Sequence, residues 1–173
     1  MIDFVCYGHP KSKGSTKSFA FVRKGATVAV RGGKVTGVST ATTSMTKGLK
    51  EWEQAVATEA RLALANALRA GAPGARVLDE PVYLEMLFAM PRPQRLKALR
   101  NVPCDTTPDA SKLWRAVEDA LIGVLMSDDK RVTRWWGNKR FANPEEAPHV
   151  RVRIGPMSEV IGNDAVLIAG ETR

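Results

Sequence analysis

Hydrophobic and polar residues follow distinct periods along this chain of 173 residues, and the periods predict its elements. Residues 2 to 7 have the composition of a short strand. Short β-type pieces follow in the sequences FAFV, ATVAV and KVTGVS, which glycine-containing turns separate. We expect these pieces to form a meander or an edge hairpin.

A helical period begins at Thr46 and continues to about Arg69. Apolar residues recur there at intervals of three and four, and Gly71 with Pro73 ends the pattern. Residues 81 to 90 are too short for a globular helix and too rich in β-forming residues, so they predict a central strand.

The second half of the chain predicts a loop, a second helix and two strands. Residues 91 to 103 contain four Arg or Lys and no acid between two prolines, and they predict a mobile loop. A helix is expected at about 110 to 125, with one apolar stripe made by Leu113, Val117, Ala120, Leu121 and Val124. Strands are expected at 131 to 141 and at 149 to 154.

Alternation along these last two strands predicts the direction of their side chains. Val150, Val152 and Ile154 should face the core, which leaves a basic outer surface of His149, Arg151 and Arg153. Trp135 and Trp136 are adjacent, so one should point inward as core and the other outward, toward an unpaired base or a dimer contact.

Together these elements predict an α+β fold, in which a small mixed sheet from the N-terminal, middle and late strands packs against two main helices. We expect one domain over residues 1 to 155 and a C-terminal tail of unknown role over residues 156 to 173.

Composition adds a partner class to this fold. The formal net charge of +8 and the pI near 9.8 favour an anionic partner, of which nucleic acid is the commonest. Two cysteines, without metal-ligand spacing, exclude a disulfide framework and a C-x-x-C zinc site. Neither an apolar signal segment nor a membrane-length apolar run is present, so we expect a cytoplasmic protein.

Five carboxylates gather between residues 106 and 129 of this basic chain. Ordinary structure explains each one separately: Asp109 as a helix N-cap, Asp128 and Asp129 as part of a turn, Glu118 and Asp119 as solvated partners of Arg115. Taken together, carboxylates brought close to one another repel unless a divalent cation neutralises them. An acidic site inside a basic field is the electrostatic arrangement of a metal-dependent nuclease.

The order of these residues resembles a known signature. The stretch PDASKLWRAVEDALIGVLMSDDKRV is similar to the motif of RusA-type Holliday junction resolvases, P-D-x-D-[NK]-L-x-[KR]-x-x-x-D-A-L-x-G-x-x-x-x-D-D. The N-terminal GHPKSKGSTKSF is similar to that family's G-x-P-x-x-K-G opening, and the resemblance covers about residues 4 to 154. It implies a RusA-like fold and a homodimeric endodeoxyribonuclease of phage or bacterial recombination and repair.

The resemblance also implies the site residues. Asp109 and Asp129 match the family's metal-binding aspartates, Asp119 matches a further acid, and Arg115 takes the place of the essential basic residue near the scissile phosphate. Mg²⁺, with Mn²⁺ as a substitute, would be held by residues from this motif, with Asp109 and Asp129 ranked first, Asp119 second, and Asp128, Glu118 and Ser111 below them. The basic opening and the loop would bind the arms of branched DNA through Lys11, Lys13, Lys17, Arg92, Arg95, Lys97 and Lys112.

Ser111 departs from the family pattern, which has an aspartate at that position. Ser111 could bind metal through its hydroxyl or a water, Glu118 could supply the missing carboxylate, or the site could be degraded. Three functions therefore stay open. The first is Mg²⁺-dependent resolution of Holliday junctions, the second a weakened or inactive junction-binding protein, and the third a general nucleic-acid-binding module.

Overall fold

The computed structural model describes residues 1–14, 16–22, 29–31, 34–36, 38–44, 46–96 and 98–160 of the chain. The chain divides into two compact units, one made by Met1–Ser12 with Gly48–Arg173 and the other by Lys13–Lys47. Over the described parts of the chain, no helix combines the length and the apolar character that crossing a membrane requires.

The first unit is built on a four-stranded sheet with the order β1-β8-β6-β7. Its strands are β1 (Ile2–Tyr7), β6 (Val82–Met90), β7 (Val132–Phe141) and β8 (His149–Pro156). β8 pairs antiparallel with both β1 and β6, whereas β7 pairs parallel with β6. The sheet is therefore mixed, and β6 is an interior strand, as the sequence predicts.

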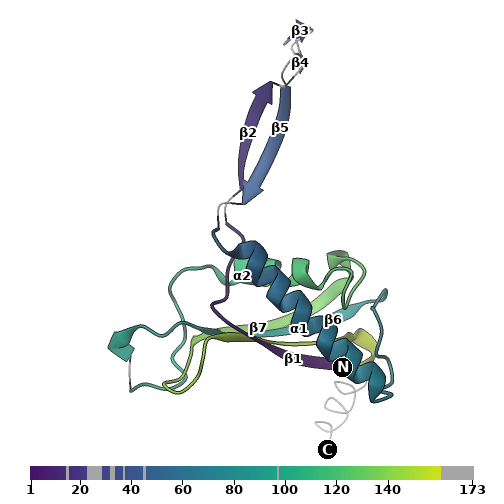
Figure 1. The fold of residues 1–173 in the computed structure, drawn as a ribbon, viewed down its shortest axis with the longest axis vertical. Coiled ribbons are helices and arrows are strands. Elements are labelled where there is room, and N and C mark those ends of the chain that lie inside the picture. The colour runs from purple at the N-terminus through teal and green to yellow at the C-terminus, as the bar shows by residue number, and fades with distance from the viewer. Residues whose placement is uncertain are drawn as a thin grey trace, which may run out of the picture. The chain divides into compact units, whose positions relative to one another are not determined.

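Two main helices, α1 (Leu49–Arg69) and α2 (Ala110–Leu121), pack on the sheet, which confirms the α+β prediction (Figure 1). α2 belongs to the crossover between β6 and β7, which parallel pairing of two strands requires. Short 3-10 turns flank it at η1 (Gln94–Leu96) and η2 (Asp129–Arg131).

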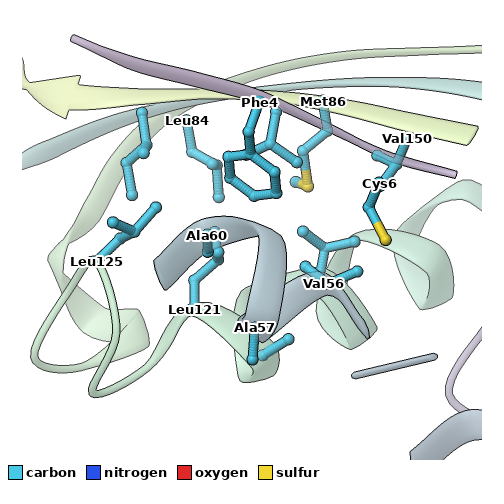
Figure 2. Close-up of a cluster of buried hydrophobic side chains, with 14 of the residues drawn as sticks. Phe4, Cys6, Val56, Ala57, Ala60, Leu84, Met86, Leu121, Leu125 and Val150 are labelled. Atoms are coloured by element: carbon cyan, nitrogen blue, oxygen red, sulfur yellow. The ribbon is translucent and has the colours of Figure 1, made fainter. Parts of the chain in front are cut away.

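The core lies between the helices and one face of the sheet (Figure 2). Leu84 and Met86 of β6 and Leu121 of α2 are almost completely buried because alternate strand residues and one helical stripe meet there. Ala57 and Ala60 form the small side of α1 in this cluster. Together these contacts fix the position of α2, which carries most of the acidic motif.

The second helix ends earlier than the apolar stripe predicts. α2 stops at Leu121, and Gly123 turns the chain with φ of 72°, a conformation that favours glycine. The Gly123 amide donates to the Met126 carbonyl at 2.7 Å, and Val124 stays buried through this turn rather than through the helix.

The described residues of the second unit form two antiparallel strand pairs. β2 (Thr16–Val22) pairs with β5 (Val38–Ser44), and β3 (Ala29–Arg31) pairs with β4 (Lys34–Thr36). The expected hairpin is confirmed, but these strands do not join the main sheet, so that part of the prediction is wrong. β5 is rich in Thr and Ser and contains no regular apolar alternation that a main sheet would bury.

Trp135 and Trp136 also differ from the prediction. Their exposed fractions are 53% and 51%, so neither is a core residue. The reason is that β7 lies at the end of the sheet, where each face is only partly covered. The Trp135 ring instead lies against Trp114 of α2, with ring centroids 4.2 Å apart.

Candidate functional site

Asp109 occupies the N-cap position of α2, but its side chain makes no capping hydrogen bond. Its backbone carbonyl accepts from the amides of Lys112 and Leu113, both at 3.2 Å. The carboxylate, 60% exposed, lies 3.0 Å from the Lys112 ammonium. Asp109 therefore does not cap the helix through its side chain. Its carboxylate instead lies at the surface beside the Lys112 ammonium.

Lys139 of β7 positions the segment that leads into α2. Its ammonium donates to the carbonyls of Thr106, at 2.7 Å, and Pro108, at 2.8 Å. The Cys104 amide donates to the Lys139 carbonyl at 3.1 Å, and the Thr107–Pro108 peptide is cis. These contacts hold the approach to Asp109 against the far end of β7.

A hollow of about 260 Å³ adjoins this approach segment. Its lining includes His9 and Lys11 of the N-terminal motif together with Thr106 and Thr107. The fold thus brings His9 and Lys11 beside the segment that leads into α2. Hydroxyl and ammonium groups in one hollow can bind a phosphate.

Asp128 and Asp129 lie together on the turn before β7. The Asp128 carboxylate accepts from the Lys130 amide at 3.0 Å and lies 3.0 Å from the Lys130 ammonium. The Lys130 amide, then the Lys130 side chain and a hydrogen bond with Asp129 lower the Asp128 pKa to about 2. Asp128 is therefore ionised at neutral pH, next to the exposed Asp129.

Asp79 is a further acid at this turn, and the sequence analysis missed it. The Ser127 hydroxyl donates to the Asp79 carboxylate at 2.5 Å, and the Arg131 guanidinium donates to it at 2.7 Å. These two contacts, Ser127 first, hold the Asp79 pKa below its ordinary value. Spacing along the chain could not reveal the role of Asp79, because a backbone bridge between Leu78 and Met126 brings its segment to the turn that carries the other acids.

The acids at the two ends of α2 stay apart within one chain. Asp109 precedes the helix and Asp129 follows it, and 12 helical residues span about 18 Å at 1.5 Å each. The length of β7 supports the same estimate. Lys139, near one end of this strand, contacts the segment that precedes Asp109, whereas Val132 begins the strand directly after the turn that carries Asp129. Among the described residues, no three His, Cys, Asp or Glu side chains are grouped to hold a metal ion.

The donor set at the turn nevertheless matches one mode of Mg²⁺ binding. Proteins usually hold Mg²⁺ through one or two carboxylates while the ion keeps several waters. Asp128 and Asp129 supply two neighbouring carboxylates, of which Asp128 stays ionised far below neutral pH. The residues present thus fit a hydrated Mg²⁺ at this turn, with Asp109 outside its reach in the same chain.

The remaining predicted site residues lie along α2. Ser111 and Arg115 are exposed, whereas Glu118 and Asp119, in the last turn of the helix, are half-buried. Arg115 lies about 9 Å along the axis from Asp109, close to the middle of the helix. α2 therefore presents a cation between its two acidic ends.

The predicted DNA-binding residues have different surroundings. The Arg92 guanidinium donates to the backbone carbonyls of Ala142, Leu96 and Leu99, so it anchors its own loop. Arg95 is exposed, Lys17 lies on β2 opposite Thr43, and Lys97 lies outside the described residues. Lys11 lines the hollow, Lys13 begins the second unit, and Lys112 pairs with Asp109. A role of these residues in DNA binding stays a prediction.

A family of known proteins matches the chain. The family model described as Endodeoxyribonuclease RusA matches residues 31–155, which is more than half of the chain. The match includes α1, the interior strand β6, α2 and the turn with Asp128 and Asp129. No curated protein matches the chain.

Proposed function

Because the chain belongs to the RusA endodeoxyribonuclease family, we propose that it resolves Holliday junctions by Mg²⁺-dependent paired nicks in DNA recombination and repair. The family match carries this proposal, since it includes the whole segment from Asp109 to Asp129. A role in the cytoplasm of a bacterium or a phage-infected host belongs to the same proposal.

The residues of α2, the turn before β7 and the hollow have distinct tasks in the proposed reaction. Asp128 and Asp129 would hold Mg²⁺, which polarises a phosphoryl oxygen and stabilises the leaving oxygen when it is bound. Arg115 stabilises the negative charge that the phosphate carries in the transition state. Lys112 and the hollow beside Lys11 position the DNA backbone, and Asp119 supports the metal ligands from the last helical turn.

The separation of Asp109 from Asp129 supports a homodimer. A two-fold axis that crosses α2 near its middle would run the two helices antiparallel and bring Asp109 of one copy toward Asp129 of the partner subunit. Two such sites would then face opposite strands of a four-way junction, whose own symmetry is close to two-fold. Paired nicks follow from this symmetry without a second kind of site.

A labelled four-way junction tests the function. The wild-type chain and Asp129→Asn are incubated with it in Mg²⁺, Mn²⁺, Ca²⁺ and EDTA, with Asp105→Asn as the matched control because Asp105 is an exposed acid outside α2 and its turn. We expect symmetric nicks in Mg²⁺ and Mn²⁺ that Asp129→Asn loses and Asp105→Asn keeps, while junction binding persists in both variants.

Two outcomes would contradict the proposal. Junction binding without cleavage under every metal would identify an inactive junction-binding protein, which Ser111 in place of the family aspartate favours. Equal affinity for linear duplex and for the junction would identify a general nucleic-acid-binding module.

Mixing two inactive variants tests the dimer. If Asp109 and Asp129 act across the two-fold axis, a mixed dimer of Asp109→Asn and Asp129→Asn contains one intact site and one doubly altered site. We expect single nicks to reappear on mixing. Sedimentation of the differently tagged chains confirms that mixed dimers form. Their continued inactivity would show that Asp109 and Asp129 do not complete one site across the two-fold axis.

A further inference from the structure

A trough lies over β6 on the face of the sheet opposite the core. Its volume is about 380 Å³, and Leu87 and Ala89 of β6 lie at its floor. The register places Asn138 and Arg151 on either side of Leu87, and Arg140 and His149 on either side of Ala89. Trp136 stands one step further along β7, opposite Glu85. The trough is therefore an apolar strip between two polar walls.

The dimensions of the trough suit a flat ring. The two flanking strands are about 10 Å apart, since each strand spacing is about 4.8 Å. Trp136 is 51% exposed although large aromatic side chains are mostly buried in folded proteins. A second hollow of about 500 Å³ shares Glu146 and His149 with the trough and extends to Tyr7, whose ring centroid lies 5.6 Å from that of His149. Aromatic rings thus recur across this face from β7 to β1.

Acidic neighbours orient the arginines of the trough. Glu146 accepts two hydrogen bonds from Arg140, at 2.5 and 2.7 Å, and this contact raises the Arg140 pKa. Asp3 accepts from Arg151 at 3.0 and 2.5 Å. A guanidinium carries five N–H donors, more than these contacts use. The face also carries Arg134 and Arg153, so its arginines outnumber the acids Asp3, Glu85 and Glu146.

We propose that this trough binds single-stranded DNA, with a base stacked on Trp136 and backbone phosphates on Arg140 and Arg151. Sheets that bind single strands combine exposed aromatic rings for the bases with cations for the backbone, and both occur here. The choice of DNA rests on the proposed function, since branched DNA can present unpaired nucleotides to a protein that binds it. The trough lies on the face of the sheet that α2 does not cover, so it is separate from the acids.

Adjacent tryptophans provide a matched comparison. Trp135 and Trp136 have nearly equal exposed fractions, 53% and 51%, but Trp135 faces Trp114 of α2 and Trp136 faces the trough. Fluorescein-labelled oligo(dT) is titrated with the full chain in EDTA, and fluorescence anisotropy gives the affinity. We expect Trp136→Ala to weaken binding about tenfold, Trp136→Phe to weaken it less than about threefold, and Trp135→Ala to change it less than about twofold. Arg151→Gln should reduce the slope of log affinity against log salt by about 0.7.

Circular dichroism of each variant first establishes that it is folded. Unchanged oligo(dT) affinity in Trp136→Ala, or equal losses in Trp135→Ala and Trp136→Ala, would overturn the trough as the binding site. The same protein samples are assayed for junction nicking. If Trp136→Ala loses oligo(dT) while the wild type fails to nick junctions, the trough is supported and the proposed function fails. If Asp129→Asn abolishes nicking but Trp136→Ala leaves the oligo(dT) affinity unchanged, the proposed function stands and only the binding role of the trough is refuted.

Discussion

Replacing Gly137 with alanine tests how α2 is fixed against β7. A methyl group at Gly137 would lie 2.6 Å from Cζ2 of Trp114 and 2.8 Å from its Cε2 and Nε1. Carbon atoms in good contact are about 3.5 to 4.0 Å apart, so the overlap is about 1 Å. The Trp114 ring has little room to withdraw, because Trp135 lies 4.2 Å away, measured between ring centroids.

The magnitude follows from two opposing effects. Overpacking of this kind costs about 1 to 3 kcal/mol, whereas losing a strand glycine recovers about 0.5 to 1 kcal/mol. We expect Gly137→Ala to lower the free energy of unfolding by about 1 to 2 kcal/mol. For a chain of this size, the melting temperature should fall by roughly 2 to 8 °C.

Urea unfolding followed by circular dichroism measures this change, with Asn138→Ala on the same strand as the control. The decisive comparison is a double-mutant cycle with Trp114→Leu, in which the cost of Gly137→Ala should largely disappear. The steric account is refuted if Gly137→Ala is neutral in the wild type or costs as much with leucine at 114. Near-UV circular dichroism should also change, because the Trp114 and Trp135 rings would move.

Three further predictions follow from other sites. Arg140 holds the Glu146 pKa at about 2 against an ordinary 4.5, so the folded state binds fewer protons than the unfolded state between these values. Wild-type stability should therefore fall as pH drops through this window, and urea unfolding of Glu146→Gln should show a flatter pH dependence; equal slopes would contradict this. Leu121→Ala should cost about 2 to 5 kcal/mol in urea unfolding because Leu121 is fully buried, and a loss below about 1 kcal/mol would mean that the core collapses around the site. Ser111→Asp restores the family carboxylate and should lower the Mg²⁺ concentration needed for half-maximal nicking; an unchanged requirement would exclude residue 111 from the metal site.

Much of the fold follows from local patterns. The period of three and four residues between Thr46 and Arg69 gave α1 within a few residues, and alternation in β8 correctly separated Val150 and Val152 from Arg151 and Arg153. Local patterns succeed here because the exposed and buried sides of an element repeat with its own geometry. They failed at residue 121, where the apolar stripe continues although Gly123 ends the helix.

The candidate site, like the fold, was only partly predictable from the sequence. The order of acids from Asp109 to Asp129 could be read directly, together with its resemblance to a nuclease family. Neither the contact of Asp79 with Ser127 nor the low pKa of Asp128 follows from spacing along the chain. The first depends on backbone pairing across 48 residues, and the second on the geometry of one 3-10 turn.

Local propensity and residue order thus account for the elements, the apolar stripes and the acidic motif of this protein, because each depends on neighbours a few residues apart. Tertiary packing accounts for the rest. It brings Asp79 to Ser127 and Arg131, leaves Trp135 and Trp136 exposed on an end strand, and builds the trough over β6. These features depend on strand order and register, which join residues that are remote in the chain and that no local period relates.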